Sequence, residues 1–298
     1  MASGTRTEVV LSGDSGHAAI VRVSWSPLRR DSRHASEMIS QVLLGEALEI
    51  VEPASGRDLQ REHPDWAAVR APDGYEGFVT LGSLITCTES TAADWKSRAS
   101  TMSLGTGLNP IDRDDAGSGT DAPRHAPWGA KLASAADGTI ELPDGGQVHA
   151  TDPTRIIAEA VRTVRYPRDT VTIARTAMEW LGTPYLWGGR TGQGADCSGF
   201  VQSVFGLHGF ALARDSGDQF DAGPKVEGPD SAHGGAAGDL WFFAFGGGPV
   251  SHVGICLGGA RMIHASQTRG CVMIDDLGES EFGRRLTAGF VGAVRVEA

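Results

Sequence analysis

The chain has 298 residues, of which 26 are basic and 37 acidic, so its formal net charge is −11. This length suffices for two or three domains of about 100–150 residues each. The acidic balance argues against nucleic acid or an anionic membrane surface as the main partner, because both require a basic footprint. No apolar run is long enough to span a bilayer, the N-terminal segment lacks a signal-peptide pattern, and the four cysteines are widely spaced. We therefore expect a cytoplasmic protein without membrane insertion.

Short apolar runs separated by turns dominate the first half of the chain. Within residues 1–87, the segment "DWAAVRAPDGYEGFV" has the alternation and turn of a hairpin in a small antiparallel barrel. Residues 88–104 are polar with little periodicity, and a linker rich in Pro, Gly and Asp follows. Further strand-like pieces up to about residue 150 predict a second small barrel within residues 88–165.

The pattern changes after residue 168. The segment "RDTVTIARTAMEWLG" predicts a helix that begins at Asp169 or Thr170, ends before Gly182, and packs through an apolar stripe. The stripe consists of Val171, Ala174, Ala177, Met178 and Leu181. A second helix is predicted in "CSGFVQSVFGLHG", and five strand-like segments follow it. Helices followed by strands indicate an α+β domain over residues 166–298.

Cys197 stands where the second of these helices begins. A free cysteine is most often a small buried hydrophobe. The first turn of a helix, however, has unpaired N–H groups and a dipole that favour a thiolate, which is the reactive form. The apolar face of this helix is already supplied by Phe200, Val201, Val204 and Phe205. Cys197 is therefore a candidate nucleophile, and Cys87, Cys256 and Cys271 are interpreted as structural.

Two histidines on neighbouring strands are candidates for the base. In "SHVGICLG", Val253, Ile255 and Leu257 point to one side of the strand, and His252 and Cys256 point to the other. His264 lies in "RMIHAS", which is interpreted as the next antiparallel strand. Cysteine and histidine also bind zinc, but the spacing matches no compact zinc motif. The glycine-rich "GGRTGQGADC" lacks nucleotide-loop spacing. We expect neither a metal nor a cofactor.

Five segments, in this order, resemble the NlpC-type cell-wall cysteine peptidases, a papain-like superfamily with a Cys–His–polar triad. They are "AMEWLGTPYLWGGRTGQGADCSGFVQSVF", "ARDSGDQF", "GDLWFF", "SHVGICLG" and "MIHAS". The resemblance covers about residues 170–297. It implies a papain-like catalytic domain in which Cys197 is the nucleophile, His252 the base and His264 the orienting residue.

The first half of the chain resembles a bacterial SH3-like domain in "SQVLLGEALEIVE" and "DWAAVRAPDGYEGFV". Together with "RDSGDQ", this combination is similar to the γ-D-glutamyl-L-diamino acid peptidases that trim murein peptides. The resemblance implies a small murein peptide with a free N-terminal L-Ala as substrate. Its α-ammonium would be held by Glu46 and Tyr75 of the SH3-like domain and by Asp215 and Ser216 of the catalytic domain.

The remaining predicted site residues surround the nucleophile. The backbone N–H of Cys197 and the hydroxyl of Tyr185 are expected to hold the oxyanion. Further substrate-binding residues are expected at Tyr185, Trp187, Asp196, Ser198 and Ser251. Two other functions stay open: an exported hydrolase of intact peptidoglycan, and a non-catalytic protein that binds wall peptides.

Overall fold

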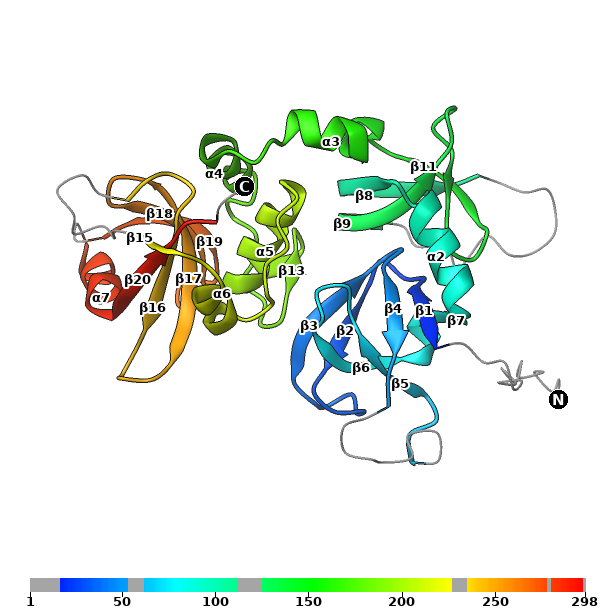
Figure 1. The fold of residues 1–298 in the computed structure, drawn as a ribbon, viewed down its shortest axis with the longest axis horizontal. Helices are drawn as coiled ribbons and strands as arrows, with labels where there is room; N and C mark the ends of the chain where they lie inside the picture. Colours follow the sequence, from blue (N-terminus) through cyan, green and yellow to red (C-terminus); the bar gives the residue numbers. More distant parts are fainter. Residues whose placement is uncertain (1–16, 53–61, 112–124, 227–234, 278–279, 297–298) are drawn as a thin grey trace.

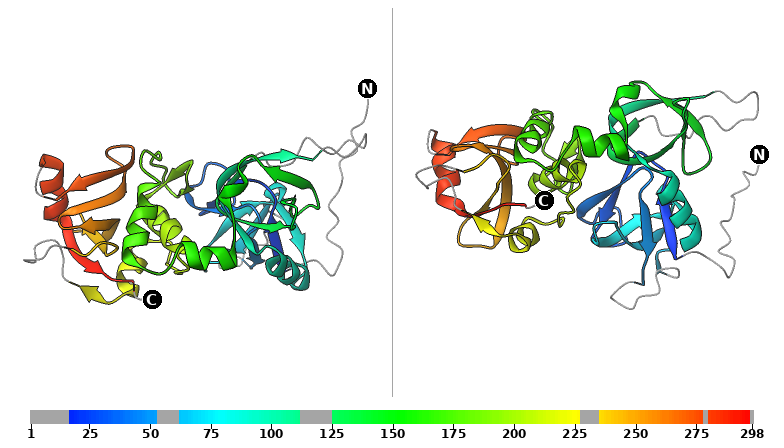
Figure 2. Two further views of the ribbon diagram at one scale, coloured as in Figure 1. Left: turned by 90° about the horizontal axis from the view of Figure 1, so that it is seen from above. Right: turned by 45° about the horizontal axis from the view of Figure 1, so that its top comes forward.

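The computed structural model describes residues 17–52, 62–111, 125–226, 235–277 and 280–296. These residues form an N-terminal β unit, a middle β unit and a C-terminal unit of helices and a sheet (Figure 1). The views in Figure 2 agree that the C-terminal unit lies at one end of the molecule and the two β units lie together at the other. Most of the predicted Pro-, Gly- and Asp-rich linker falls on residues outside the described ranges.

The N-terminal unit is one antiparallel sheet with the strand order β3-β2-β6-β5-β4-β1-β7. Its elements are β1 (Ala18–Val21), β2 (Trp25–Arg29), β3 (Met38–Leu43), β4 (Ala47–Ile50), β5 (Trp66–Arg70), β6 (Glu76–Thr80), a 3-10 turn (Leu81–Ser83) and β7 (Leu84–Cys87). The predicted hairpin is β5 paired with β6. Its turn contains Gly74 at a φ of 83°, a conformation that glycine adopts without strain. The turn places Tyr75 immediately before β6.

The middle unit is a five-stranded sheet flanked by two helices. Its elements are α2 (Glu89–Arg98), β8 (Thr101–Pro110), β9 (His125–Ser134), β10 (Ile140–Glu141), β11 (Gln147–Ala150), a 3-10 turn (Pro153–Arg155), β12 (Ile156–Ala158) and α3 (Glu159–Arg165). The sequence analysis missed α2. Thr88 caps this helix, and the buried Trp95 anchors it by donating a hydrogen bond of 2.8 Å to the Gly45 carbonyl. Because one large side chain anchors α2, the helix lacks the long apolar stripe by which hydrophobic periodicity reveals a helix.

The C-terminal unit packs helices on a six-stranded sheet of order β15-β20-β16-β17-β18-β19. Its strands are β13 (Arg190–Thr191), β14 (Gly194–Ala195), β15 (Lys225–Val226), β16 (Leu240–Ala244), β17 (Val250–Gly258), β18 (Arg261–Ser266), β19 (Cys271–Asp276) and β20 (Phe290–Val294). Its helices are α4 (Thr170–Met178), α5 (Cys197–Leu207), α6 (Ser216–Ala222) and α7 (Glu281–Gly289).

Alternation along β17 separates two cores, as predicted. Val253 and Ile255 pack in the cluster that contains the apolar residues of α5. Cys256 packs on the opposite face of the sheet in the cluster that contains Leu286 of α7. The predicted structural role of Cys256 agrees with its complete burial.

The predicted stripe of α4 is wrong for its three large apolar residues, whereas its member Ala177 is buried. Val171, Met178 and Leu181 are 62%, 37% and 45% exposed. The face that packs on the core instead carries Ile173, Thr176, Ala177 and Trp180. Thr176 is buried because its hydroxyl bonds the Nε2 of His208 (2.9 Å), so a polar residue occupies a position that the apolar pattern cannot report. No helix among the described residues is both long and apolar enough to cross a membrane.

Candidate active site

Cys197 is the first residue of α5, directly after the N-cap Asp196. The Asp196 carboxylate accepts a 2.7 Å hydrogen bond from the Gly199 N–H, which fixes the first turn of the helix. The thiol is 8% exposed, and its Sγ lies 4.0 Å from the carbonyl oxygen of Ser251. The backbone N–H of Val253 also acts on this sulfur. Helix α5 therefore brings the thiol against the residues that flank His252 on β17.

The two predicted histidines lie in line on neighbouring strands. His252 Nε2 is 2.7 Å from His264 Nδ1, and the two rings meet edge to face. His264 is almost fully buried, and its Nε2 lies 2.9 Å from Oδ2 of the buried Asp275. A continuous chain of polar atoms thus leads from the base inward to a carboxylate that the sequence analysis did not identify.

The protonation of the thiol differs from the sequence-based expectation. Burial raises the pKa of Cys197 to about 12, and the charge of Asp196 acts in the same direction. A helix N-terminus stabilises a thiolate by up to about 2 kcal/mol. The rise in pKa corresponds to a destabilisation of the thiolate by about 4 kcal/mol, so burial outweighs the helix. Burial lowers the pKa of His252 to about 3, and a proton on His264 would act in the same direction. With these pKa values the Cys197 thiol and the His252 imidazole are both neutral at pH 7.

Tyr185 and Trp187 lie on the segment that leads to the nucleophile. Burial raises the pKa of the Tyr185 hydroxyl, and a thiolate at Cys197 would act in the same direction. Trp187 is 56% exposed and donates a 2.8 Å hydrogen bond from Nε1 to Glu37 of the N-terminal unit. Tyr185 is thus placed near the reacting sulfur, and Trp187 bridges the two units.

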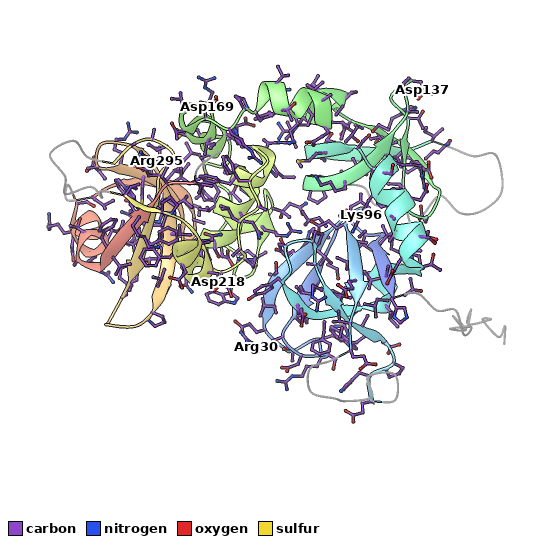
Figure 3. The ribbon with its side chains drawn as sticks, viewed as in Figure 1. Arg30, Lys96, Asp137, Asp169, Asp218 and Arg295 are labelled. Atoms are coloured by element: carbon purple, nitrogen blue, oxygen red, sulfur yellow. The ribbon has the colours of Figure 1, made fainter. Side chains whose placement is uncertain are left out.

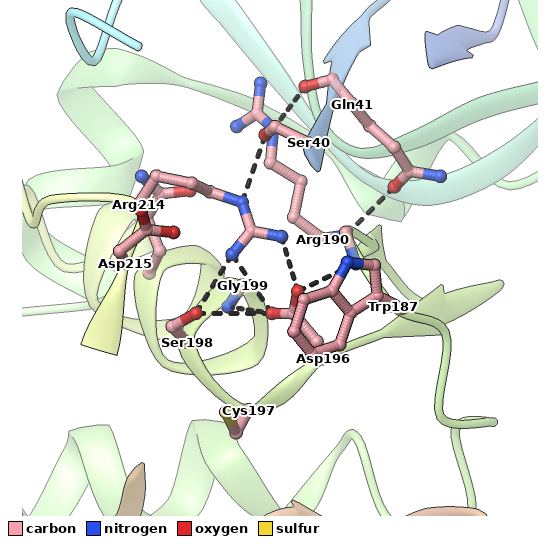
Figure 4. A network of polar contacts seen from close by, with 12 residues as sticks. Ser40, Gln41, Trp187, Arg190, Asp196, Cys197, Ser198, Gly199, Arg214 and Asp215 are labelled. Atoms are coloured by element: carbon pink, nitrogen blue, oxygen red, sulfur yellow. Dashed lines mark hydrogen bonds and ion pairs between the residues drawn. The ribbon is translucent and has the colours of Figure 1, made fainter. Parts of the chain in front are cut away.

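Arg214 supports the nucleophile turn from behind. Its Nη1 and Nη2 donate to the two carboxylate oxygens of Asp196 at 3.0 and 2.7 Å, and Nη1 also donates to the Ser198 hydroxyl at 2.9 Å. Its Nε donates to Ser40 Oγ of β3 at 3.0 Å (Figure 4). Burial alone would lower the pKa of Arg214, but Asp196 outweighs it and the pKa is raised. Asp196 and Ser198, which are predicted to bind substrate, both take part in this buried network.

Glu46, predicted to hold the substrate's ammonium group, has other partners. Its Oε2 accepts from the Leu43 N–H at 2.9 Å, and its Oε1 pairs with the guanidinium of Arg190. Arg190 also donates from Nε to the carbonyl of Gln41 at 2.8 Å. A carboxylate this deeply buried needs a counter-charge, and the catalytic unit supplies it. Glu46 therefore joins the two units, and its contact with the substrate's ammonium group stays a prediction.

Tyr75 and Asp215 do meet across the same interface. The Tyr75 hydroxyl donates a 2.9 Å hydrogen bond to Oδ2 of Asp215, and the Asp215 side chain remains exposed. Ser216, the next residue, is buried at the start of α6. The pKa of Tyr75 is raised mainly by burial and by its bond to Asp215, while the charges of Arg214 and Arg30 act in the opposite direction.

A second exposed carboxylate lies near this pair. Arg30, labelled on the N-terminal unit in Figure 3, pairs with Glu37 through a 2.8 Å bond from Nε. Glu37 is also the residue that accepts from Trp187. Glu37, which was not predicted from the sequence, thus links Arg30 near Tyr75 with Trp187 of the catalytic unit.

A separate cavity of about 260 Å³ lies between the middle and C-terminal units, lined by residues that include Trp128, Arg155, Glu179 and Trp180. None of the predicted site residues lines it. Among the described residues, no group of three or more His, Cys, Asp or Glu side chains is arranged to hold a metal ion.

Comparison with protein families matches this geometry to known domains. Residues 182–291, which contain Cys197, His252 and His264, match the NlpC/P60 family. Residues 28–84 match the bacterial dipeptidyl-peptidase SH3 domain. The chain combines these two domains. The predicted resemblance of both halves is confirmed.

Relatives of the NlpC/P60 domain include two proteins named gamma-D-glutamyl-L-lysine dipeptidyl-peptidase. The protein from Bacillus subtilis is 43% identical over 118 residues, which are 39% of this chain and 38% of that protein. The protein from Bacillus cereus is 40% identical over 104 residues, 34% of this chain and 30% of that protein. The matched segments thus span 38% and 30% of these relatives, less than half of either.

The fold of the whole chain is similar to the crystal structure of an NlpC/P60 family protein from Bacillus cereus ATCC 10987. The TM-score is 0.72 at 20% sequence identity, covering 93% of this chain and 99% of that one. The similarity confirms the predicted α+β fold class and extends across the SH3 domain as well as the NlpC/P60 domain.

Proposed function

We propose that this protein is a cysteine peptidase that cleaves the bond between γ-D-Glu and an L-diamino acid in murein peptides with a free N-terminal L-Ala. The observation that carries this proposal is the hydrogen bond between Tyr75 and Asp215. It joins the SH3 domain to the segment next to Arg214, and hence to the nucleophile turn. The names of the two Bacillus relatives support the same class of substrate. Such an enzyme would act on released peptides and so serve their recycling.

The amino end of the substrate would bind at this interface. An ammonium group removed from water needs carboxylate and hydroxyl acceptors. Asp215 and Glu37 supply exposed carboxylates, and Tyr75 supplies a phenolic oxygen. Because part of this set belongs to the SH3 domain, the domain would close one end of the groove and restrict the enzyme to short peptides.

The chemistry uses residues of the NlpC/P60 domain. His252 takes the proton of the Cys197 thiol as the sulfur attacks the γ-carbonyl carbon of D-Glu. The oxyanion accepts hydrogen bonds from the Cys197 N–H and the Tyr185 hydroxyl. The intermediate collapses, the C–N bond breaks, and the imidazolium gives its proton to the leaving amine. His252 then activates a water molecule that hydrolyses the thioester and frees L-Ala-D-Glu.

Hydrolysis of L-Ala-γ-D-Glu-L-Lys and of its meso-diaminopimelate analogue tests this proposal. We expect release of L-Ala-D-Glu from the free peptide and a kcat/KM about 10–100-fold lower after N-acetylation of the alanine, because charged hydrogen bonds are lost. Cys197→Ala should abolish turnover while the fold, followed by circular dichroism, stays intact. Equal cleavage of free and acetylated peptides would overturn the ammonium site, and turnover by Cys197→Ala would overturn the nucleophile.

Two further measurements separate the other functions. Clearing of a cell-wall suspension would indicate a hydrolase of intact peptidoglycan instead. Binding of the tripeptide without turnover, together with a Cys197 thiol that resists iodoacetamide at every pH, would indicate a binding protein. We expect neither result.

A further inference from the structure

A buried carboxylate lies behind the histidine pair. Asp275 is 7% exposed, and its Oδ2 is 2.9 Å from Nε2 of His264, which is 1% exposed. In the β18–β19 register, His264 pairs with Met273, and Asp275 pairs with Met262. Asp275 is therefore two residues along from the partner of His264, on the same face of the sheet and within reach of its ring.

We propose that Asp275 is a positioning residue that sets the tautomers of both histidines and so leaves Nδ1 of His252 free to accept the thiol proton. This inference goes beyond the proposed function, although its kinetic consequences rest on it. No substrate is needed to state it, because it concerns where two protons lie.

The available donors and acceptors determine where the two protons lie. An ionised carboxylate only accepts hydrogen bonds, so Nε2 of His264 must carry the proton of the 2.9 Å contact. The Nδ1 of a neutral His264 then has a lone pair, and the 2.7 Å contact must be donated by Nε2 of His252. His252 is neutral in this structure, since its pKa is lowered to about 3, so its second nitrogen, Nδ1, is the unprotonated one.

The opposite arrangement would disable the base. If His264 carried its proton on Nδ1, it would donate to Nε2 of His252, and the His252 proton would move to Nδ1. Nδ1 of His252 would then carry a proton and would have no lone pair to accept the proton of the thiol. Because both contacts are short hydrogen bonds, whether residue 275 accepts or donates a hydrogen bond determines the tautomers of both histidines.

The orientation of Asp275 is itself secured. Its Oδ1 lies 3.4 Å from Nη2 of Arg269, and the Arg269 guanidinium lies over the ring of Phe282 at 4.7 Å. The cation and His264 therefore approach different oxygens of one carboxylate. The negative charge also stabilises, through His264, the imidazolium that forms on His252 during the reaction.

Asp275→Asn is the sharpest test because it hardly changes the shape of the side chain. Arg269 can only donate hydrogen bonds, so it would hold the amide oxygen and turn the amide nitrogen toward His264. Nε2 of His264 would then have to accept, and both tautomers would reverse. We expect kcat for the tripeptide to fall by about 10²–10⁴-fold with KM within about twofold. Asp276→Asn, on the next position of β19 and facing the other way, is the matched control.

Nitrogen-15 NMR of histidine-labelled Cys197→Ala reads the tautomers without substrate. We expect protonated Nε2 in both His252 and His264, and protonated Nδ1 in both after Asp275→Asn is added. Protonated Nδ1 in His264 of the protein with Asp275 intact would overturn the inference. So would unchanged tautomers and unchanged kcat in a folded Asp275→Asn protein. If the tripeptide is not cleaved but the tautomers are as stated, the proposed substrate fails and the role of Asp275 stands.

Discussion

Replacing Arg214 by methionine tests the support of the nucleophile turn. The change removes two hydrogen bonds to Asp196, one to Ser198 and one to Ser40. It also leaves the Asp196 carboxylate, whose side chain is 11% exposed, without its counter-ion. Breaking a buried ion pair by removing one partner costs about 3–5 kcal/mol. The Gly188 and Gly199 N–H groups still bond Asp196, so we expect the lower end of this range, about 3 kcal/mol.

Thermal unfolding measures this cost. A loss of about 3 kcal/mol corresponds to a Tm lower by roughly 6–12 °C for a chain of this size. The matched control is Arg175→Met on the exposed face of α4, which should shift Tm by less than about 2 °C, as surface changes do. Restoring neutrality with Asp196→Asn in the same chain should recover part of the loss. If Arg214→Met melts within 1 °C of the control, the reasoning about the buried pair is refuted.

Three further predictions follow from the site. Tyr75→Phe removes a neutral donor to Asp215, so KM for the free tripeptide should rise by about 3–10-fold, with little change for the acetylated peptide; a parallel change in both would contradict the ammonium site. Because the pKa of Cys197 is raised to about 12, its alkylation by iodoacetamide should accelerate about tenfold per pH unit from 7 to 10, and a plateau above pH 8 would contradict the neutral thiol. Because the pKa of His252 is lowered to about 3, the folded state loses stability as pH falls below the unfolded value of about 6.5. At pH 5 the loss is about 2 kcal/mol, so the Tm of His252→Asn should fall less than that of wild type between pH 7.5 and 5, and equal falls would count against it.

Local chemistry made part of this site predictable from the sequence. The apolar face of "CSGFVQSVFGLHG" and the alternation of "SHVGICLG" are each set by residues that lie close together in the sequence. They predicted the helix that begins at Cys197 and the separation of Val253 and Ile255 from Cys256. Asp275 could have been found in the same way. It is a carboxylate in the strand "CVMIDD" beside the strand of His264, where a buried charge requires a partner.

Contacts between distant segments could not be predicted in this way. Arg214 and Ser40 are 174 residues apart, and Tyr75 and Asp215 are 140 apart. Periodicity reports whether a side chain is buried, but not which charge faces it. Glu46 illustrates the difference: its residue type suggested an ammonium ligand, whereas the domain packing supplied Arg190. Val171 of α4 shows the opposite error: as an apolar residue it was predicted to pack on the core, but it is exposed.

The position of β3 explains why the SH3 domain packs against the segment around Cys197 rather than forming a tethered module. β3 is an edge strand, so its outer backbone groups have no partner within its own sheet. Arg190 satisfies one of them by donating to the Gln41 carbonyl, and Arg214 takes the Ser40 hydroxyl of the preceding residue. These two arginines lie on either side of Cys197 in the sequence. Removing the SH3 domain would therefore unpair buried groups on both sides of the nucleophile turn, so the domain supports the geometry of the thiol.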